Sequence, residues 1–298
     1  MIPEKQLKAL LHLLDDPDEE VAGAVVARIL AYGNEAIPQL EKAWAHSHDE
    51  ALQGRLETLI HRVHFSELSD DFREWDAAEM PDLLQGAILL SRYAYPGLRI
   101  ENVLTQFERV RLNAWLEINT YLSPIEQVNA LNSVLYGYYR LQGSELSRRQ
   151  PAPFFLNALL DSRQGNAFSL GVLYLALCER LDVPLFAVSI PQQFLLAYMN
   201  GSPGEIPEED STDLARHIRF YLDPVNGNIY SPFDVAAYLR KTGAVQSARY
   251  YVPLPPRKIM RQMLEALAIA YEGQKKEEKA AEVRLLRKLI SEEPEDIF

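Results

Sequence analysis

The sequence predicts an α+β protein that is mostly helical, with a buried helix packed on a small antiparallel sheet and helical-repeat-like elements flanking that core. Apolar residues recur at helical spacing through most of the chain. Residues 167–181 are apolar nearly all round, which is typical of a helix enclosed on several sides. Three short β-rich runs follow this helix, at 184–190, 193–199 and 216–222.

The pattern changes twice along the chain, and these changes predict three parts. A length of 298 residues allows one large domain or two modest ones. We expect an N-terminal helical segment at 1–68, a core with leading helices at 69–254, and a C-terminal helical hairpin at 255–298.

The N-terminal part contains four apolar stripes at helical spacing. They predict two short helix pairs of the kind found in HEAT or armadillo-type repeats, of which about one and a half units are present. The alternative is a helical cap on the core. The stripes are Leu7, Leu10, Leu11 and Leu14; Val21, Val25, Ile29 and Leu30; Ile37, Leu40 and Trp44; and Leu52, Leu56, Leu59 and Val63.

Three helices are expected before the buried one. The first ends at Tyr95-Pro96-Gly97, and the second spans about 100–122. The third begins at Ser123-Pro124, because serine is a favoured N-cap and proline fits the first helical position. Residues 143–153 are polar and contain two prolines, which predicts a loop.

Helices also follow the β-rich runs. Residues 201–213 between the last two runs are rich in Gly, Pro and acids, so we expect an exposed loop there. Ser231-Pro232-Phe233-Asp234 predicts a capped helix that runs to about Lys241. Stripes at 260–269 and 280–290 predict a helical hairpin about the length of a tetratricopeptide unit.

Composition excludes several classes of function. Acidic residues outnumber basic ones by 42 to 30, and phosphate binding needs clustered Lys and Arg, so we expect no nucleic-acid partner. The longest apolar stretch, 168–178, is too short to cross a bilayer, and no secretory leader is visible, so we expect a cytoplasmic protein without a membrane partner. The single cysteine, Cys178, excludes an intrachain disulfide, and we expect no cofactor and no metal.

An ordered series of short motifs begins before the buried helix. It comprises Arg163-Gln164-Gly165-Asn166-Ala167, then Leu181-Asp182-Val183-Pro184, Pro191-Gln192-Gln193-Phe194 and Leu222-Asp223-Pro224. The series resembles the transglutaminase-like superfamily, specifically its bacterial SirB-type branch. The resemblance covers about 76–294, and it implies a core like that of cysteine proteases and transglutaminases.

The resemblance also implies where a catalytic triad would lie. In that superfamily a cysteine at the start of the buried helix is the nucleophile, a histidine on the next strand is its base, and an aspartate orients the histidine. These positions fall on Ala167, Gln193 and Asp223. Alanine cannot attack a carbonyl and glutamine cannot shuttle a proton near neutral pH, so two of the three groups are missing. Asp223 precedes a proline at a strand end, where a local turn role is expected.

Other reactive side chains do not replace the missing pair. Cys178 lies eleven residues along the same helix, about 16 Å deeper at 1.5 Å per residue, and is interpreted as a buried free cysteine. Ser169 is turned away from the Ala167 face and is expected to pack or cap. His217 is about 20 Å along its strand from Asp223. His46-Ser47-His48 is interpreted as a solvated loop.

The sequence leaves three functional hypotheses open. The first is a catalytically inactive transglutaminase-like protein that binds a protein or peptide, with Asn166, Gln193 and Asp223 lining the former active-site cleft. The second is an active amide hydrolase or acyltransferase with a non-standard nucleophile. The third is a regulatory role that acts through protein partners.

Overall fold

The computed structural model describes residues 9–10, 13, 19–143, 150–201, 215–245 and 247–292. Most of the first predicted helix, Arg148-Arg149 and most of the 201–213 loop lie outside the described residues. The chain separates into two compact units, Met1–Glu74 and Trp75–Phe298. The three-part division at 68 and 254 stays a prediction.

Unit 1 is helical and has its own apolar cluster. The second, third and fourth stripes bury Val25, Ile29, Leu40, Leu56 and Val63 against one another. The fourth helix continues past the end of its apolar stripe. The elements, the last of which ends in unit 2, are α2 (Glu19–Leu30), η1 (Gly33–Ala36), α3 (Ile37–His46) and α4 (Glu50–Ala77).

Unit 2 begins with helices whose ends follow local hydrogen bonding. Ser123 and Glu126 form a reciprocal capping box, which confirms the predicted start of α7. The second helix ends at Glu117 rather than at 122, because Asn119 Oδ1 accepts from the backbone N–H of Tyr121 and begins a turn. The elements are α5 (Leu83–Ala94), α6 (Ile100–Glu117), α7 (Pro124–Asn132), the π-helical η2 (Ser133–Tyr138), η4 (Ala152–Phe154) and α8 (Leu156–Ser162).

The core of unit 2 is a buried helix on a four-stranded antiparallel sheet. The sheet has the order β3-β4-β5-β6, so each strand pairs with its neighbour in sequence. The predicted helix and the first two strands match within a residue, whereas the third strand begins at 218 rather than 216. The elements are α9 (Ala167–Arg180), β3 (Leu185–Ile190), β4 (Gln193–Met199), β5 (Ile218–Leu222) and β6 (Ile229–Tyr230).

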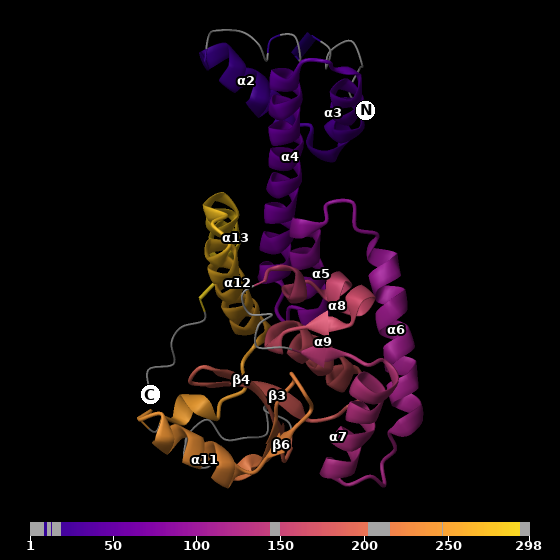
Figure 1. The fold of residues 1–298 in the computed structure, drawn as a ribbon, viewed down its shortest axis with the longest axis vertical. Helices are drawn as coiled ribbons and strands as arrows, with labels where there is room; N and C mark the ends of the chain where they lie inside the picture. The colour runs from indigo at the N-terminus through magenta and orange to yellow at the C-terminus, as the bar shows by residue number, and fades with distance from the viewer. Residues whose placement is uncertain are drawn as a thin grey trace. The chain divides into compact units, whose positions relative to one another are not determined.

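The two faces of this sheet carry different helices (Figure 1). On one face Phe194 of β4 stacks near Phe168 of α9, with ring centroids 4.8 Å apart. On the other face Leu195 and Ala197 pack in a cluster with Val235, from α11 (Pro232–Lys241). Strand side chains alternate between faces, so β4 contributes to both layers. Two further two-residue strands, β1 (Gln142–Gly143) and β2 (Gln164–Gly165), pair in parallel just before α9.

The C-terminal residues form the expected pair of packed helices. Arg284 on the second helix pairs with Glu272 on the first, and its Nη2 lies 3.2 Å from Glu265 Oε1. Their resemblance to a tetratricopeptide unit stays a prediction. The elements are η6 (Ala248–Tyr250), α12 (Pro256–Gly273) and α13 (Glu277–Leu289).

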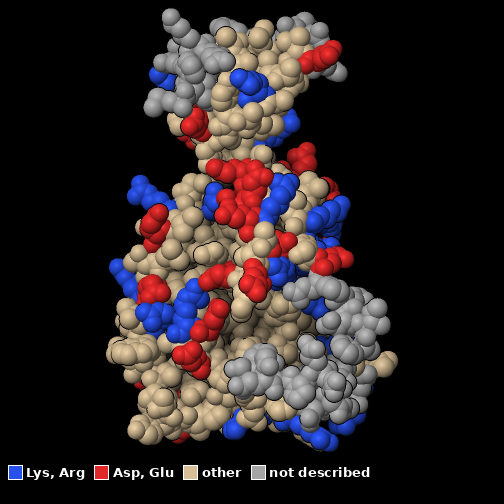
Figure 2. All heavy atoms as spheres, turned by 180° about the vertical axis from the view of Figure 1, so that it is seen from behind, with Lys and Arg blue, Asp and Glu red and all other residues tan. Residues whose placement is uncertain are grey.

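On the face in Figure 2, Lys and Arg side chains are interspersed with Asp and Glu. Within the described ranges, every helix is too short or too polar to span a bilayer. The expectations of no nucleic-acid partner and of a cytoplasmic location stay predictions.

Candidate functional site

The first turn of α9 is where the family resemblance places a nucleophile. Asn166 caps this turn: its Oδ1 accepts from the backbone N–H groups of Phe168 and Ser169, each at 3.0 Å. Ser169 Oγ in turn accepts from the Asn166 N–H at 3.1 Å. The capping box therefore engages the Asn166 Oδ1 and the Ser169 hydroxyl, whereas the buried Asn166 Nδ2 has no hydrogen-bond partner among the described residues. The role of Asn166 in ligand binding stays a prediction.

The chain approaches this turn too closely for a side chain at 165. A Cβ added to Gly165 would lie 2.8 Å from Leu159 Cδ1 and 2.9 Å from Ser169 Oγ. The glycine before the nucleophile position is therefore required by packing. Ala167 is itself buried.

Phe194 and Pro224, which adjoin the other two triad positions, contact α9 one turn after Ala167. A Cβ on Gly171 would lie 2.5 Å from Phe194 Cε1 and 3.5 Å from Pro224 Cγ. Ala167 and Gly171 are four residues apart and share a helix face. The structure thus brings the neighbourhoods of Ala167, Gln193 and Asp223 together.

Gln193 nevertheless lies on the other face of β4 from Phe194. Gln193 lies opposite Ile190 of β3 and two residues before Leu195 on β4, so its side chain is on the same sheet face as theirs. Ile190 and Leu195 pack on the α11 side of the sheet. Phe194, whose ring meets α9, occupies the side that faces the nucleophile position. Alternation therefore directs Gln193 away from Ala167.

The Asp223 carboxylate forms a local turn. Its Oδ1 accepts from the Val225 N–H at 2.8 Å, the Asx-type contact expected before a proline. Two side chains from the preceding helices also stabilise this turn. Tyr136 Oη donates to Pro224 O at 2.8 Å, and Asn132 Nδ2 donates to Gly227 O at 2.8 Å. Burial, together with the Asp223 charge, raises the pKa of Tyr136. The role of Asp223 in ligand binding stays a prediction.

The chain's one thiol is enclosed. Cys178 is fully buried in α9, and burial raises the pKa of its thiol, so the thiolate form is disfavoured. Ser169 is buried as well, with its hydroxyl engaged in the capping box. Both residues therefore have the packing and capping roles that the sequence predicts.

Metal-ligating side chains do not gather in the described part of the chain. No group of three or more His, Cys, Asp or Glu residues has the arrangement of a metal site there. His46 Nδ1 lies 2.7 Å from the backbone oxygen of Lys42, within its own helix. The expectation of no metal and no cofactor stays a prediction.

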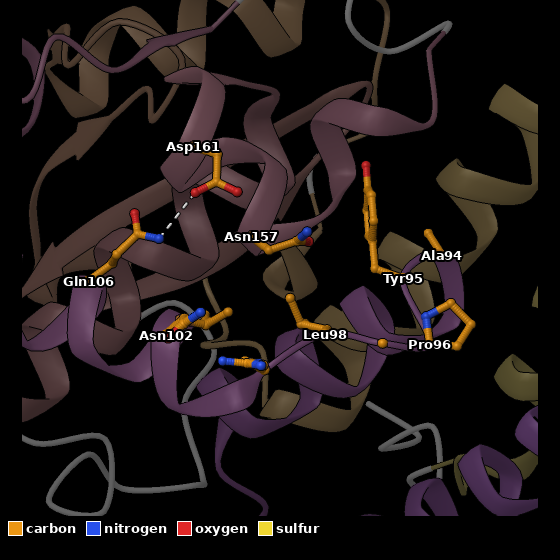
Figure 3. Close-up of a pocket in the computed structure, with 11 residues that line it drawn as sticks. Ala94, Tyr95, Pro96, Leu98, Asn102, Gln106, Asn157 and Asp161 are labelled. Atoms are coloured by element: carbon orange, nitrogen blue, oxygen red, sulfur yellow. Dashed lines mark hydrogen bonds between the residues drawn. The ribbon is translucent and has the colours of Figure 1, made fainter. Parts of the chain in front are cut away.

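A pocket that the sequence reasoning missed lies beside α8. It has a volume of about 640 Å³ and is bounded by the turn after α5, the first two turns of α6, and α8. We call it the α6–α8 pocket (Figure 3). The sequence signal that could have indicated this pocket is a pair of polar residues spaced four apart on each of two helices, Asn102 and Gln106 on α6 and Asn157 and Asp161 on α8. Its lining includes Tyr95, Leu98, Arg99, Asn102, Gln106, Asn157 and Asp161.

Comparison with known proteins places the core in a family. Residues 101–265, more than half of the chain, match the transglutaminase-like superfamily. The UPF0162 protein YchA of Escherichia coli K12 is 26% identical over 219 residues, which cover 72% of this chain and 76% of YchA. Protein SirB1 of Salmonella typhimurium is 34% identical over 114 residues, 38% of this chain and 42% of SirB1.

A more distant relative shares a shorter stretch. F-box only protein 21 of Pongo abelii is 32% identical over 77 residues, which cover 26% of this chain and 12% of that protein. No solved structure matches the chain. The chain therefore belongs to the transglutaminase-like superfamily and is a SirB-type member of it.

Proposed function

We propose that this chain is a non-catalytic transglutaminase-like protein that acts by binding a protein or a peptide. The observation that carries the proposal is the state of the first turn of α9. The nucleophile position holds Ala167, the nearby hydroxyl of Ser169 caps the helix, and the only thiol is buried.

Acyl transfer in this superfamily requires a group that attacks the carbonyl and a base that takes its proton. Working nucleophile–base pairs lie within about 3 Å of each other. Gln193 is not a base near neutral pH, and strand parity directs it away from Ala167. The same arrangement counts against the alternative of an active hydrolase with a different nucleophile.

A binding role is supported by apolar side chains exposed on one side of α6 and just after it. Trp115 is 59% exposed, Leu116 70% and Tyr121 95%. Leu104, Leu112, Trp115 and Leu116 share one side of α6 by their spacing, and exposed apolar groups that share a helix face are typical of protein–protein contact surfaces. We call the set the α6 apolar face; its members are Leu104, Leu112, Trp115, Leu116, Tyr121 and Ile125.

Chemistry is tested with an electrophilic acyl probe and intact-mass measurement. We expect no adduct on Ser169 or Cys178, because the Ser169 hydroxyl is engaged in the capping box and the Cys178 thiol is buried. A stoichiometric adduct that disappears in Ser169→Ala or Cys178→Ser would contradict the proposal.

Binding is tested by placing a photo-cross-linking amino acid at position 116, with position 285 as the control. Leu285 is also an exposed leucine on a helix, but it lies outside the α6 apolar face. In cells that produce this protein naturally, we expect a discrete adduct at 116 that is absent at 285. It should be lost when Trp115→Glu is added. Equal adducts at both positions, or none at 116, would count against a partner on this face.

A further inference from the structure

The α6–α8 pocket has two polar walls. Asn102 and Gln106 are four residues apart on α6, and Asn157 and Asp161 are four apart on α8, so each pair lies on one helix face. Gln106 Nε2 donates to Asp161 Oδ1 at 3.1 Å and joins the walls at one end of the pocket (Figure 3). The side chains between the walls come from the turn after α5.

Asn157 has hydrogen-bonding capacity that the fold leaves unused. The residue is only 7% exposed, and within the described part of the chain its Oδ1 has no hydrogen-bond partner. Its amide end points toward Tyr95 across the pocket (Figure 3). Leaving a buried polar atom unpaired costs about 1–3 kcal/mol. A buried amide that carries this cost beside a cavity is well placed to be satisfied by a ligand.

Both signs of charge line the same cavity. Asp161 contributes a carboxylate, and Arg99 contributes a guanidinium from the residue just before α6. Within the described ranges, the Arg99 side chain has no ion pair or side-chain hydrogen bond. A free guanidinium is suited to a carboxylate, with two parallel hydrogen bonds.

The remaining wall is apolar. The Tyr95 ring packs edge-to-face on the buried Phe155, with centroids 5.7 Å apart. Leu98 also lines the pocket (Figure 3). A volume of about 640 Å³ lies within the range of small-molecule sites, which pair an apolar wall with a few placed polar groups.

We propose that the α6–α8 pocket binds a zwitterionic α-amino-acid ligand, either a free amino acid or a short peptide with unblocked termini. Arg99 pairs with the ligand carboxylate and Asp161 with its ammonium group. The Asn157 amide bonds to a backbone polar group of the ligand, and an apolar side chain of the ligand lies against Tyr95 and Leu98. This inference stands apart from the proposed partner surface, because no member of the α6 apolar face lines the pocket.

The test is calorimetric titration of the full chain with phenylalanine, the dipeptide Ala-Phe, N-acetyl-Ala-Phe and Ala-Phe amide. We expect at least one unblocked probe to bind, and each blocked form to bind about tenfold more weakly, because each block removes one charge-assisted contact. Whether phenylalanine or Ala-Phe binds more tightly identifies the ligand size. Failure of both unblocked probes at millimolar concentration, or equal affinity for free and blocked forms, overturns the proposal.

Matched variants assign the contacts. Arg99→Gln should remove the preference for the free acid over the amide, whereas Arg109→Gln, an exposed α6 arginine outside the pocket, should leave it unchanged. Asn157→Ala should weaken both forms about tenfold. An Arg99→Gln variant that keeps the acid preference contradicts the assignment. Because these titrations do not involve position 116, the partner proposal can fail independently.

Discussion

The first turn of α9 and the α6–α8 pocket differ in how their polar groups are used. At α9, Asn166 is 1% exposed and its Oδ1 accepts two backbone amides. At the pocket, Asn157 is similarly buried, yet its Oδ1 lacks a partner in the described part of the chain. The two buried asparagines thus differ in their Oδ1 atoms, although the Asn166 Nδ2, like the Asn157 Oδ1, has no partner in that part of the chain.

This difference shows which structural features persist in a transglutaminase-like core whose nucleophile position holds an alanine. The turn that would activate a nucleophile is filled by Phe194 and by a capping box, so it contributes stability. The pocket keeps hydrogen-bonding groups that stability does not explain. Because a cavity lies beside the unpaired Asn157 amide and Asn166 does not line it, we look for recognition at the pocket and for packing at α9. The following measurements probe that contrast.

The largest expected contrast is in thiol accessibility. Cys178 is fully buried and its thiol pKa is raised by burial, so labelling requires opening of the core. We expect labelling by an aromatic disulfide reagent to be at least ~100-fold slower in the native protein than in urea. A Leu98→Cys variant adds a thiol in the pocket that should label rapidly. Fast labelling of Cys178 in the native wild type would show that α9 is accessible.

The next contrast concerns space around the two regions. Gly171→Ala puts a Cβ 2.5 Å from Phe194 Cε1, whereas a Cβ at Gly97 in the pocket turn meets nothing within 4 Å. We expect Gly171→Ala to lower the free energy of unfolding by about 1–3 kcal/mol and Gly97→Ala to change it by less than ~0.5 kcal/mol. Urea denaturation measures both. Equal costs would mean that the two regions are packed alike.

The two asparagines should respond differently to truncation. Asn166→Ala removes a helix cap and should cost about 1–2 kcal/mol of unfolding free energy. Asn157→Ala removes an unpaired oxygen and should cost less than ~1 kcal/mol. Thermal and urea unfolding of the pair test this directly. A larger loss in Asn157→Ala would mean that its amide supports the fold.

The smallest expected effect is at Asp223. Asparagine retains an Oδ1 that can accept from the Val225 N–H, so Asp223→Asn should change the unfolding free energy by less than ~0.5 kcal/mol. Asp223→Ala loses that contact and should cost about 1 kcal/mol. If asparagine were as costly as alanine, the negative charge rather than the turn would be what matters.

Local patterns predicted much of the core. The capping boxes at Ser123 and Ser231 and the two strands on either side of Pro191 follow from neighbouring residues alone. The predicted end of the helix at 122 was wrong, because one side chain, Asn119, decides where the turn begins. Helix starts were thus easier to predict than this helix end.

Two features depended on contacts that sequence patterns do not carry. Residues 194–199 are buried on both faces of β4, so no apolar–polar alternation reveals which face Gln193 occupies. The pocket joins segments near 95, 102 and 157, and the contact that closes one end spans 55 positions, from Gln106 to Asp161. Long-range packing fixes both features, and the spacing of polar residues within one helix does not reveal which helices meet.

Hydrogen–deuterium exchange with and without the dipeptide Ala-Phe tests the central contrast most directly. The account predicts added protection in peptides that cover 95–106 and 156–162, and no change across 165–171 at the start of α9. Protection centred on 165–171 and on the segment around Gln193, with none beside α8, would contradict it.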